Sequence, residues 1–158
     1  MNRPWLLSIA VLMCAICISI LSRPPQPTTI ESTRNSTELK EKIAAFGPSG
    51  CAWLGFALGF DYLFMAAYAT AIGLACATVA DDAGLWLHRV GMIVAYAQIA
   101  GALIDATENA TLIHILVNGF DERLMSIARL ATAAKFTIPL TGITYILIVW
   151  SVKHWWKF

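Results

Sequence analysis

The stretch Ala52–Ala80 reads AWLGFALGFDYLFMAAYATAIGLACATVA, and it contains a single charged residue, Asp61. An α-helix needs about 20 consecutive apolar residues to cross the hydrocarbon core of a bilayer. The stretch is long enough for this, and it lacks the alternation of apolar and polar residues that marks a transmembrane β-strand. It therefore predicts a membrane-spanning α-helix.

Three further apolar stretches follow the same pattern. Trp5–Leu21 contains no charge, another stretch opens at Leu85, and the last occupies Met125–Trp150. The last three of the four stretches are joined by the short segments 81–84 and 118–123, which are typical connections between antiparallel neighbours in a bundle. The sequence thus predicts an all-α integral membrane protein, an antiparallel four-helix bundle.

The composition of the whole chain agrees with this assignment. Of its 158 residues, 58% are hydrophobic and 13% are charged, whereas about a quarter of the residues in a soluble domain are charged. The mean hydropathy is +0.67. The formal net charge is +1, and no basic tract provides the positive patch that nucleic-acid binding requires. The expected partner is therefore the lipid bilayer, and nucleic acid is not expected.

The chain divides into three regions. Residues 1–22 form the predicted first transmembrane helix, which we interpret as an uncleaved signal anchor because no small-x-small cleavage site follows it; a cleaved signal peptide is the alternative. Residues 23–50 form a linker and a surface helix. Residues 51–158 form a three-helix transmembrane core that ends in an aromatic and basic interfacial anchor. The anchor residues are Trp150, Lys153, His154, Trp155, Trp156, Lys157 and Phe158.

The region 23–50 combines two patterns. Residues 23–35 are rich in Pro, Thr and Ser and predict an extended linker. A helix is then expected to start with Ser36 or Thr37 as its N-cap and to stop at Gly47. Its apolar residues share one face, so the helix either lies along the membrane surface or packs on the end of the bundle. These residues are Leu39, Ile43 and Phe46.

The predicted topology places both termini and the segment 81–84 at one end of the molecule, the terminal end. The region 23–50 and the segment 118–123 lie at the opposite end, the first-loop end. Six basic residues fall at the first-loop end against four at the terminal end. The positive-inside rule thus leans weakly toward a cytoplasmic first loop, and the orientation stays open.

Three charged residues lie deep within the apolar stretches. Measured from the terminal end, Asp61, Asp105 and Lys135 lie roughly 28, 30 and 23 Å along their helices at a rise of 1.5 Å per residue. They fall at a similar depth, toward the first-loop end. Since an unpaired charge in lipid costs several kcal/mol, we expect these side chains to point inward and pair.

Helical spacing extends this set to a polar cluster. Gln98, Gly101, Asp105, Glu108 and Asn109 follow the i, i+3, i+4, i+7 rule on one face of their helix, while Tyr68 lies seven residues after Asp61. The predicted cluster, with Arg129 as a candidate neighbour, comprises Asp61, Tyr62, Tyr68, Gln98, Asp105, Glu108, Asn109 and Lys135.

The cluster has two interpretations. It is structural if Lys135 neutralises one carboxylate and the other groups only form hydrogen bonds. It is functional if three carboxylates against one certain cation bind a cation, a proton or a lipid head group, which is the default hypothesis for ionisable residues inside a membrane. An accessory subunit of a larger membrane complex is the alternative to a binding protein, and an intramembrane enzyme is the second alternative.

Recognisable catalytic and metal-binding motifs are missing from the sequence. It contains no H-E-x-x-H, G-x-S-x-G or Walker pattern, and no Glu-x-x-His pair for a di-iron site. We therefore predict no catalytic residue, no metal ligand and no cofactor. A G-x-x-x-G motif at Gly55 and Gly59, continued by Ala67, Ala71 and Ala75, predicts close helix packing within the bundle or between copies in a homo-oligomer.

Two segments, DYLFMAAYA at Asp61–Ala69 and DATENATL at Asp105–Leu112, resemble a family of uncharacterised bacterial four-helix membrane proteins. Leu39–Gly47 and Lys135 are similar as well, so the resemblance covers about residues 38–145. It implies the same topology, a bacterial inner-membrane location and a shared polar cluster, but no activity. The residues implied for that cluster are Asp61, Asp105, Glu108 and Asn109.

Overall fold

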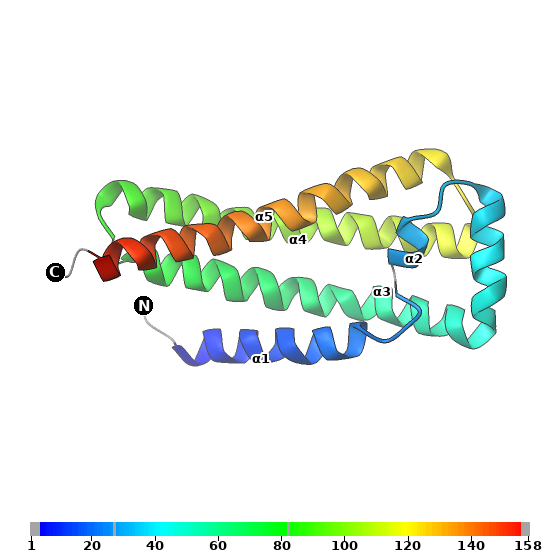
Figure 1. The fold of residues 1–158 in the computed structure, drawn as a ribbon, viewed down its shortest axis with the longest axis horizontal. Helices are drawn as coiled ribbons and strands as arrows, with labels where there is room; N and C mark the ends of the chain where they lie inside the picture. Colours follow the sequence, from blue (N-terminus) through cyan, green and yellow to red (C-terminus); the bar gives the residue numbers. More distant parts are fainter. Residues whose placement is uncertain (1–3, 27, 82, 156–158) are drawn as a thin grey trace.

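The computed structural model describes residues 4–26, 28–81 and 83–155 (Figure 1). All regular elements in these ranges are α-helices, which confirms the all-α prediction. They are α1 (Pro4–Leu21), α2 (Thr28–Glu31), α3 (Ser36–Asp81), α4 (Leu85–Asn118) and α5 (Glu122–Trp155). The helices α3, α4 and α5 are long and apolar enough to cross a membrane, whereas the apolar part of α1 is shorter.

The long helices lie side by side. Helix α4 packs against α3 and α5, α3 also contacts α5, and α1 packs against α3. Figure 1 shows α3, α4 and α5 running antiparallel, with α1 along the outer side of α3. The start of α1 and the end of α5 lie at the left, and α2 lies at the right. The right-hand end of Figure 1 is thus the first-loop end. Of the predicted anchor, Trp156, Lys157 and Phe158 lie outside the described residues.

Helix α3 has two parts that meet at Gly47. Gly47 has φ 65° and ψ −179°, and Pro48 follows it. Glycine reaches this backbone region without strain, and proline suits the first turn of a helix because its missing N–H would have no helical partner there. The helix stop expected at Gly47 is therefore a break between two helical segments. In Figure 1 the segment 36–46 stands across the first-loop end.

The N-cap of α3 is one residue earlier than the sequence analysis predicts. The prediction of Ser36 or Thr37 is wrong, because the Asn35 Oδ1 accepts the backbone N–H of Glu38 at 2.9 Å. The Glu38 carboxylate in turn accepts the backbone N–H of Arg34 at 2.8 Å. Asparagine is among the preferred N-cap residues, and this reciprocal pair resembles a capping box.

The apolar face of the segment 36–46 packs on the ends of the other helices. Leu39 is 2% exposed and belongs to a core at the first-loop end, with Ile43 and Phe46 packed against that core. The core comprises Ile30, Leu39, Leu54, Leu58, Leu112, Ile115, Met125 and Ala128. Of the two interpretations of the surface helix, packing on the bundle end therefore describes these side chains.

The linker is folded, and the prediction of an extended segment is wrong. It contains the short helix α2, and Ile30 and Thr33 are both fully buried. Arg129 Nη2 donates to the carbonyl of Thr33 at 2.7 Å, and Lys42 Nζ donates to the carbonyl of Thr29 at 3.0 Å. The local Pro, Thr and Ser content could not predict these bonds, because both cations come from other helices.

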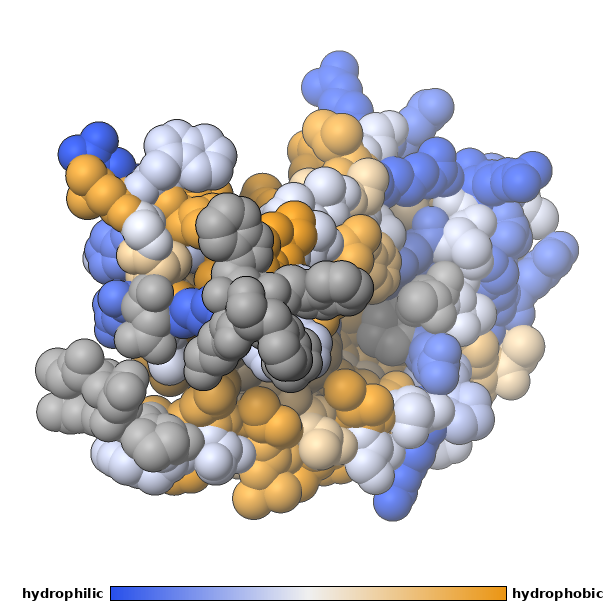
Figure 2. Space-filling view, turned by 60° about the vertical axis from the view of Figure 1, so that its left-hand side comes forward, coloured by the Kyte–Doolittle hydropathy of each residue, from blue (hydrophilic) through white to orange (hydrophobic). Residues whose placement is uncertain are grey.

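The outer surface of the long helices is apolar. Only 17% to 28% of the residues in the most apolar part of α3, α4 and α5 are buried. Large side chains such as Trp86, Ile93, Leu103 and Leu130 are between 64% and 76% exposed. Figure 2 shows hydrophobic residues over the middle of the face in view, and most hydrophilic residues toward the first-loop end at its right.

Glycines differ in how closely their neighbours approach. A Cβ atom at Gly91, Gly101 or Gly142 would collide with another side chain, whereas one at Gly55 or Gly59 would meet nothing within 4 Å. The G-x-x-x-G motif therefore makes no close contact within the described part of this chain. Its continuation does contribute to internal packing, since Ala67 and Ala71 are each only 8% exposed.

Replacing Gly47 with alanine is expected to destabilise the protein by about 1–3 kcal/mol, because a side chain strains this backbone conformation. The added Cβ would meet nothing within 4 Å, so crowding would not contribute. Gly59→Ala is the matched control, since its Cβ also meets nothing but its backbone is helical, and alanine there should be neutral or stabilising. The midpoint of denaturant-induced unfolding in detergent measures the stability of both variants. An equal loss of stability in the two would show that the backbone conformation of Gly47 is not the cause.

Candidate functional site

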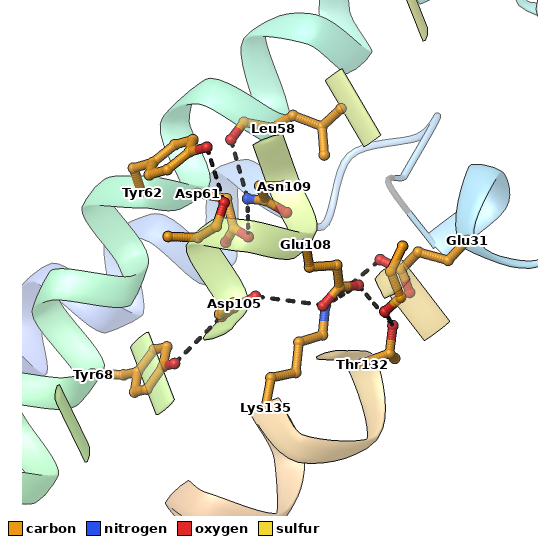
Figure 3. Close-up of polar contacts among 12 residues, drawn as sticks. Glu31, Leu58, Asp61, Tyr62, Tyr68, Asp105, Glu108, Asn109, Thr132 and Lys135 are labelled. Carbon is orange, nitrogen blue, oxygen red and sulfur yellow. Dashed lines mark hydrogen bonds and ion pairs between the residues drawn. The ribbon is translucent and has the colours of Figure 1, made fainter. Parts of the chain in front are cut away.

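The ammonium of Lys135 lies between carboxylates from two other helices (Figure 3). Its Nζ lies 3.0 Å from Glu108 Oε1, 3.6 Å from Glu31 Oε1 and 3.7 Å from Asp105 Oδ1. Glu31 ends α2, and Asp105 and Glu108 lie on α4. One cation on α5 thus joins the linker to the centre of the helix assembly.

Glu108 is fully buried. Its Oε1 accepts hydrogen bonds from Lys135 and from the hydroxyl of Thr132, at 3.0 and 2.8 Å. Its Oε2 is buried without a hydrogen-bond partner. The Oε1 oxygen of Glu108 is therefore bound to two side chains of α5, whereas its Oε2 oxygen accepts no hydrogen bond.

Helix α3 joins the site through Asp61 and Tyr68. Asn109 Nδ2 donates to Asp61 Oδ2 at 2.8 Å and to the carbonyl of Leu58 at 3.2 Å. The hydroxyl of Tyr68 donates to Asp105 Oδ2 at 3.3 Å. Asp105 is 5% exposed, and its Oδ1 accepts no hydrogen bond. We call the whole set the Lys135 cluster: Glu31, Asp61, Tyr68, Asp105, Glu108, Asn109, Thr132 and Lys135.

The structure brings together six of the eight predicted site residues. Tyr62 and Gln98 are the two exceptions. Tyr62 is 39% exposed and donates to the carbonyl of Ala106, because it points about 100° away from its neighbour Asp61 around the helix. Gln98 shares a face with Asp105, but it lies about 10 Å nearer the terminal end. Its Nε2 donates to the carbonyls of Val94 and Ile138.

Two members of the cluster were missed by sequence reasoning. Thr132 lies three residues before Lys135, so helical spacing could have identified it. Glu31 had no comparable signal, because a linker residue has no periodicity that indicates where the segment folds back. Arg129, the candidate neighbour, instead donates to the carbonyl of Thr33. It thus holds the linker in place next to the cluster.

Four carboxylates in the cluster face one ammonium, those of Glu31, Asp61, Asp105 and Glu108. Glu31 lies in α2, outside the long helices. Burial raises the pKa of Glu31 above its ordinary 4.5, the ammonium of Lys135 opposes this increase, and the neighbouring carboxylate of Glu108 adds to it. The pKa of Glu31 is thus raised mainly by burial, and the neighbouring carboxylate contributes less.

Two cavities adjoin the cluster and share Asp61, Phe64 and Lys135. The outer cavity has a volume of about 260 Å³ and reaches the end of α1 and the linker. The inner cleft has a volume of about 320 Å³ and lies between α3, α4 and α5. Besides the shared residues, the outer cavity is lined by Ile18, Leu21, Ser22, Gln26, Glu31 and Asn109, and the inner cleft by Tyr68, Ile72, Asp105, Phe136 and Pro139.

Comparison with known proteins adds no further constraint. No family model matches the chain, and no curated protein or solved structure matches it. The resemblance to bacterial four-helix membrane proteins therefore remains a sequence-based expectation.

Replacing Lys135 with methionine is expected to destabilise the protein by about 3–5 kcal/mol, because it leaves buried carboxylates without their cation. The loss should shrink at low pH, where protonated carboxyl groups need no counter-ion. Adding Glu108→Gln to Lys135→Met should restore part of the stability. Denaturant unfolding at several pH values measures the stability of the single and the double variant. Lys40→Met, at an exposed position, is the control, and an equally small effect of both substitutions would contradict the pairing.

Glu31 and Glu38 are expected to give stability profiles of opposite sign. The pKa of Glu31 is raised by burial, so the protonated form favours the folded state and stability falls as the pH rises from about 4.5 through the raised pKa. The pKa of Glu38 is lowered, first by its hydrogen bond with Lys42 and then by the N–H of Arg34. Its contribution is therefore present above about 4.5 and is lost as the pH falls through the lowered pKa.

Unfolding midpoints of Glu31→Gln and Glu38→Gln, measured from pH 3 to pH 8, check these opposite signs. Glu31→Gln should remove the decrease on the alkaline side of about pH 4.5, and Glu38→Gln should remove the decrease on the acid side. The same change of slope in both variants would show that the pKa of Glu31 is not raised.

Proposed function

We propose that this chain is a multi-pass protein of a bacterial inner membrane, in which α1, α3, α4 and α5 form an antiparallel four-helix bundle and the Lys135 cluster binds a cation. The membrane assignment is supported by three helices of sufficient length and apolarity. It is also supported by the exposed apolar side chains, which in water would form an unusually large apolar surface. The bacterial location rests on the resemblance of the two sequence motifs.

The observation that supports cation binding is an oxygen of Asp105 that accepts no hydrogen bond and lies 3.7 Å from the ammonium of Lys135. Asp105 is 5% exposed, its Oδ1 has no hydrogen-bond partner, and it lines the inner cleft. A buried acceptor without a partner costs about 1–3 kcal/mol, and more when it is charged. A proton or a small cation would remove this cost, whereas an anion would be repelled by the surplus of carboxylates.

The surplus of carboxylates in the Lys135 cluster also indicates how cation binding would affect the protein. Lys135 shares its single charge among Glu31, Asp105 and Glu108. A bound cation would take over part of this role at Asp105, so the ammonium would interact more strongly with Glu31 and Glu108. Ligand binding at the cleft is thus coupled to the folded linker through one flexible side chain.

Cation binding is tested with protein in detergent micelles. Methylammonium chloride should raise the thermal unfolding midpoint of the wild type above that found in choline chloride of equal ionic strength, because a ligand stabilises the state that binds it. Native mass spectrometry should show the bound ion. Both effects should disappear in Asp105→Asn and persist in Glu122→Gln, which removes an exposed carboxylate at the first turn of α5.

A folded Asp105→Asn variant that responds like the wild type would overturn the proposal. If the wild type itself responds to neither methylammonium nor a lower pH, the cluster holds the helices together and binds no cation. Lys135→Met should then simply unfold the protein or release a partner chain.

A second candidate function is that of an accessory subunit in a larger membrane complex. The observation that favours it is the open face at Gly55 and Gly59, where a helix from another chain could approach closely. Gly55→Ile and Gly59→Ile would then reduce the mass of the complex in native gels without lowering the stability of the monomer. No observation on the described residues favours the intramembrane-enzyme hypothesis.

A further inference from the structure

The inner cleft is charged at one end and apolar at the other, and this contrast indicates which class of ligand fits it. The inference rests on the proposed cation binding. At one end lie the carboxylates of Asp61 and Asp105 with the ammonium of Lys135, which is 5.5 Å from the centre of the Phe136 ring, and toward the terminal end lie Ile72 and Pro139. A bare cation would use only the first end. A ligand that fits the whole cleft has a positive group and an apolar part.

The polar end contains a buried acceptor with unused capacity. Asp105 Oδ1 accepts no hydrogen bond and lies 3.7 Å from Lys135 Nζ, which is longer than a charged hydrogen bond of 2.7–2.9 Å. Asp105 Oδ2 and Asp61 Oδ2 each accept one bond, from Tyr68 and Asn109 respectively. A primary ammonium has three N–H donors, which suits a site with this much free acceptor capacity.

The apolar end is continuous with the outer surface of the helices. Phe136 is 66% exposed, and Leu140, one turn further along α5, is 62% exposed. A chain attached to the ammonium can therefore lie along α5 toward the terminal end. Phe64 and Tyr68 form an edge-to-face aromatic pair on the α3 side, with centroids 5.4 Å apart. The acceptor end and the apolar exit thus lie in one cleft.

We propose that the inner cleft binds the ammonium end of an amphiphile, with its hydrocarbon chain lying along the outer surface of α5. The positive group is a primary amine, which belongs either to a lipid head group or to a free long-chain amine. An amphiphile with an anionic end is excluded by the four carboxylates. A neutral one would add no positive charge to a site in which four carboxylates share one ammonium.

Dodecylamine is the probe, with dodecanol as its uncharged match, both added to protein in maltoside micelles. Dodecylamine should raise the unfolding midpoint of the wild type by several degrees. The concentration of dodecylamine that gives half of this effect should be at least tenfold lower than that of methylammonium. Dodecanol should have no comparable effect. Asp105→Asn should abolish the response to dodecylamine, and Glu122→Gln should retain it.

A second variant tests the apolar end independently. Leu140→Ala removes an exposed side chain one turn beyond Phe136 and should leave the fold intact. Phe136 itself is kept, because its ring lies 5.5 Å from the ammonium of Lys135. Leu140→Ala should weaken the dodecylamine response several-fold while the methylammonium response stays unchanged. This variant keeps the test decisive if Asp105→Asn does not fold.

The outcomes separate this inference from the proposed function. If methylammonium stabilises the wild type but dodecylamine is no more potent, or if Leu140→Ala leaves the dodecylamine response unchanged, the amphiphile proposal is overturned and cation binding stands. If neither amine acts on the wild type, both proposals fail. A dodecylamine effect that persists in folded Asp105→Asn would be a general effect of the micelle and would overturn the inference.

The source of the amine is resolved in nanodiscs that contain either phosphatidylethanolamine or phosphatidylcholine. If native mass spectrometry finds phosphatidylethanolamine retained by the wild type and lost from Asp105→Asn, the ligand is a lipid head group. Retention of added dodecylamine without retention of phosphatidylethanolamine assigns the site to a free long-chain amine.

Discussion

The ammonium of Lys135 is the interaction on which the described arrangement depends. It lies within 4 Å of carboxylates on α2 and α4, and hydrogen bonds from Tyr68 and Asn109 extend the same network to α3. Charged groups buried to this degree are stable only when each has a partner of opposite charge or a hydrogen bond. One cation therefore links α2, α4 and α5 near the first-loop end, next to the apolar core that packs there.

The folded linker follows from the same constraint. A segment rich in Pro, Thr and Ser has few apolar residues with which to anchor itself, yet Ile30 is fully buried and Glu31 reaches Lys135. Arg129 and Lys42 each donate to a linker carbonyl. Hydrogen bonds from cations are stronger than those between neutral groups, so these contacts hold a segment that would otherwise be extended.

Excess negative charge distinguishes the cluster from an ordinary buried ion pair. A pair of opposite charges satisfies itself, whereas four carboxylates around one ammonium leave oxygens on Asp105 and Glu108 without hydrogen bonds. Asp105 lines the inner cleft together with apolar side chains that continue onto the outer surface. The same geometry thus provides both the charge and the route that an amphiphilic cation would require.

The sequence by itself determined the long helices and the depth of the charges along them. Long apolar runs, and the positions of Asp61, Asp105 and Lys135 along them, follow from the length and 3.6-residue period of a helix. Only the tertiary structure decided that Glu31 joins them, that Tyr62 and Gln98 lie apart, and that Asn35 caps α3. The reason is physical: periodicity relates residues within one helix, but it cannot show where a linker folds back or which carbonyl a neighbouring helix presents to a side chain.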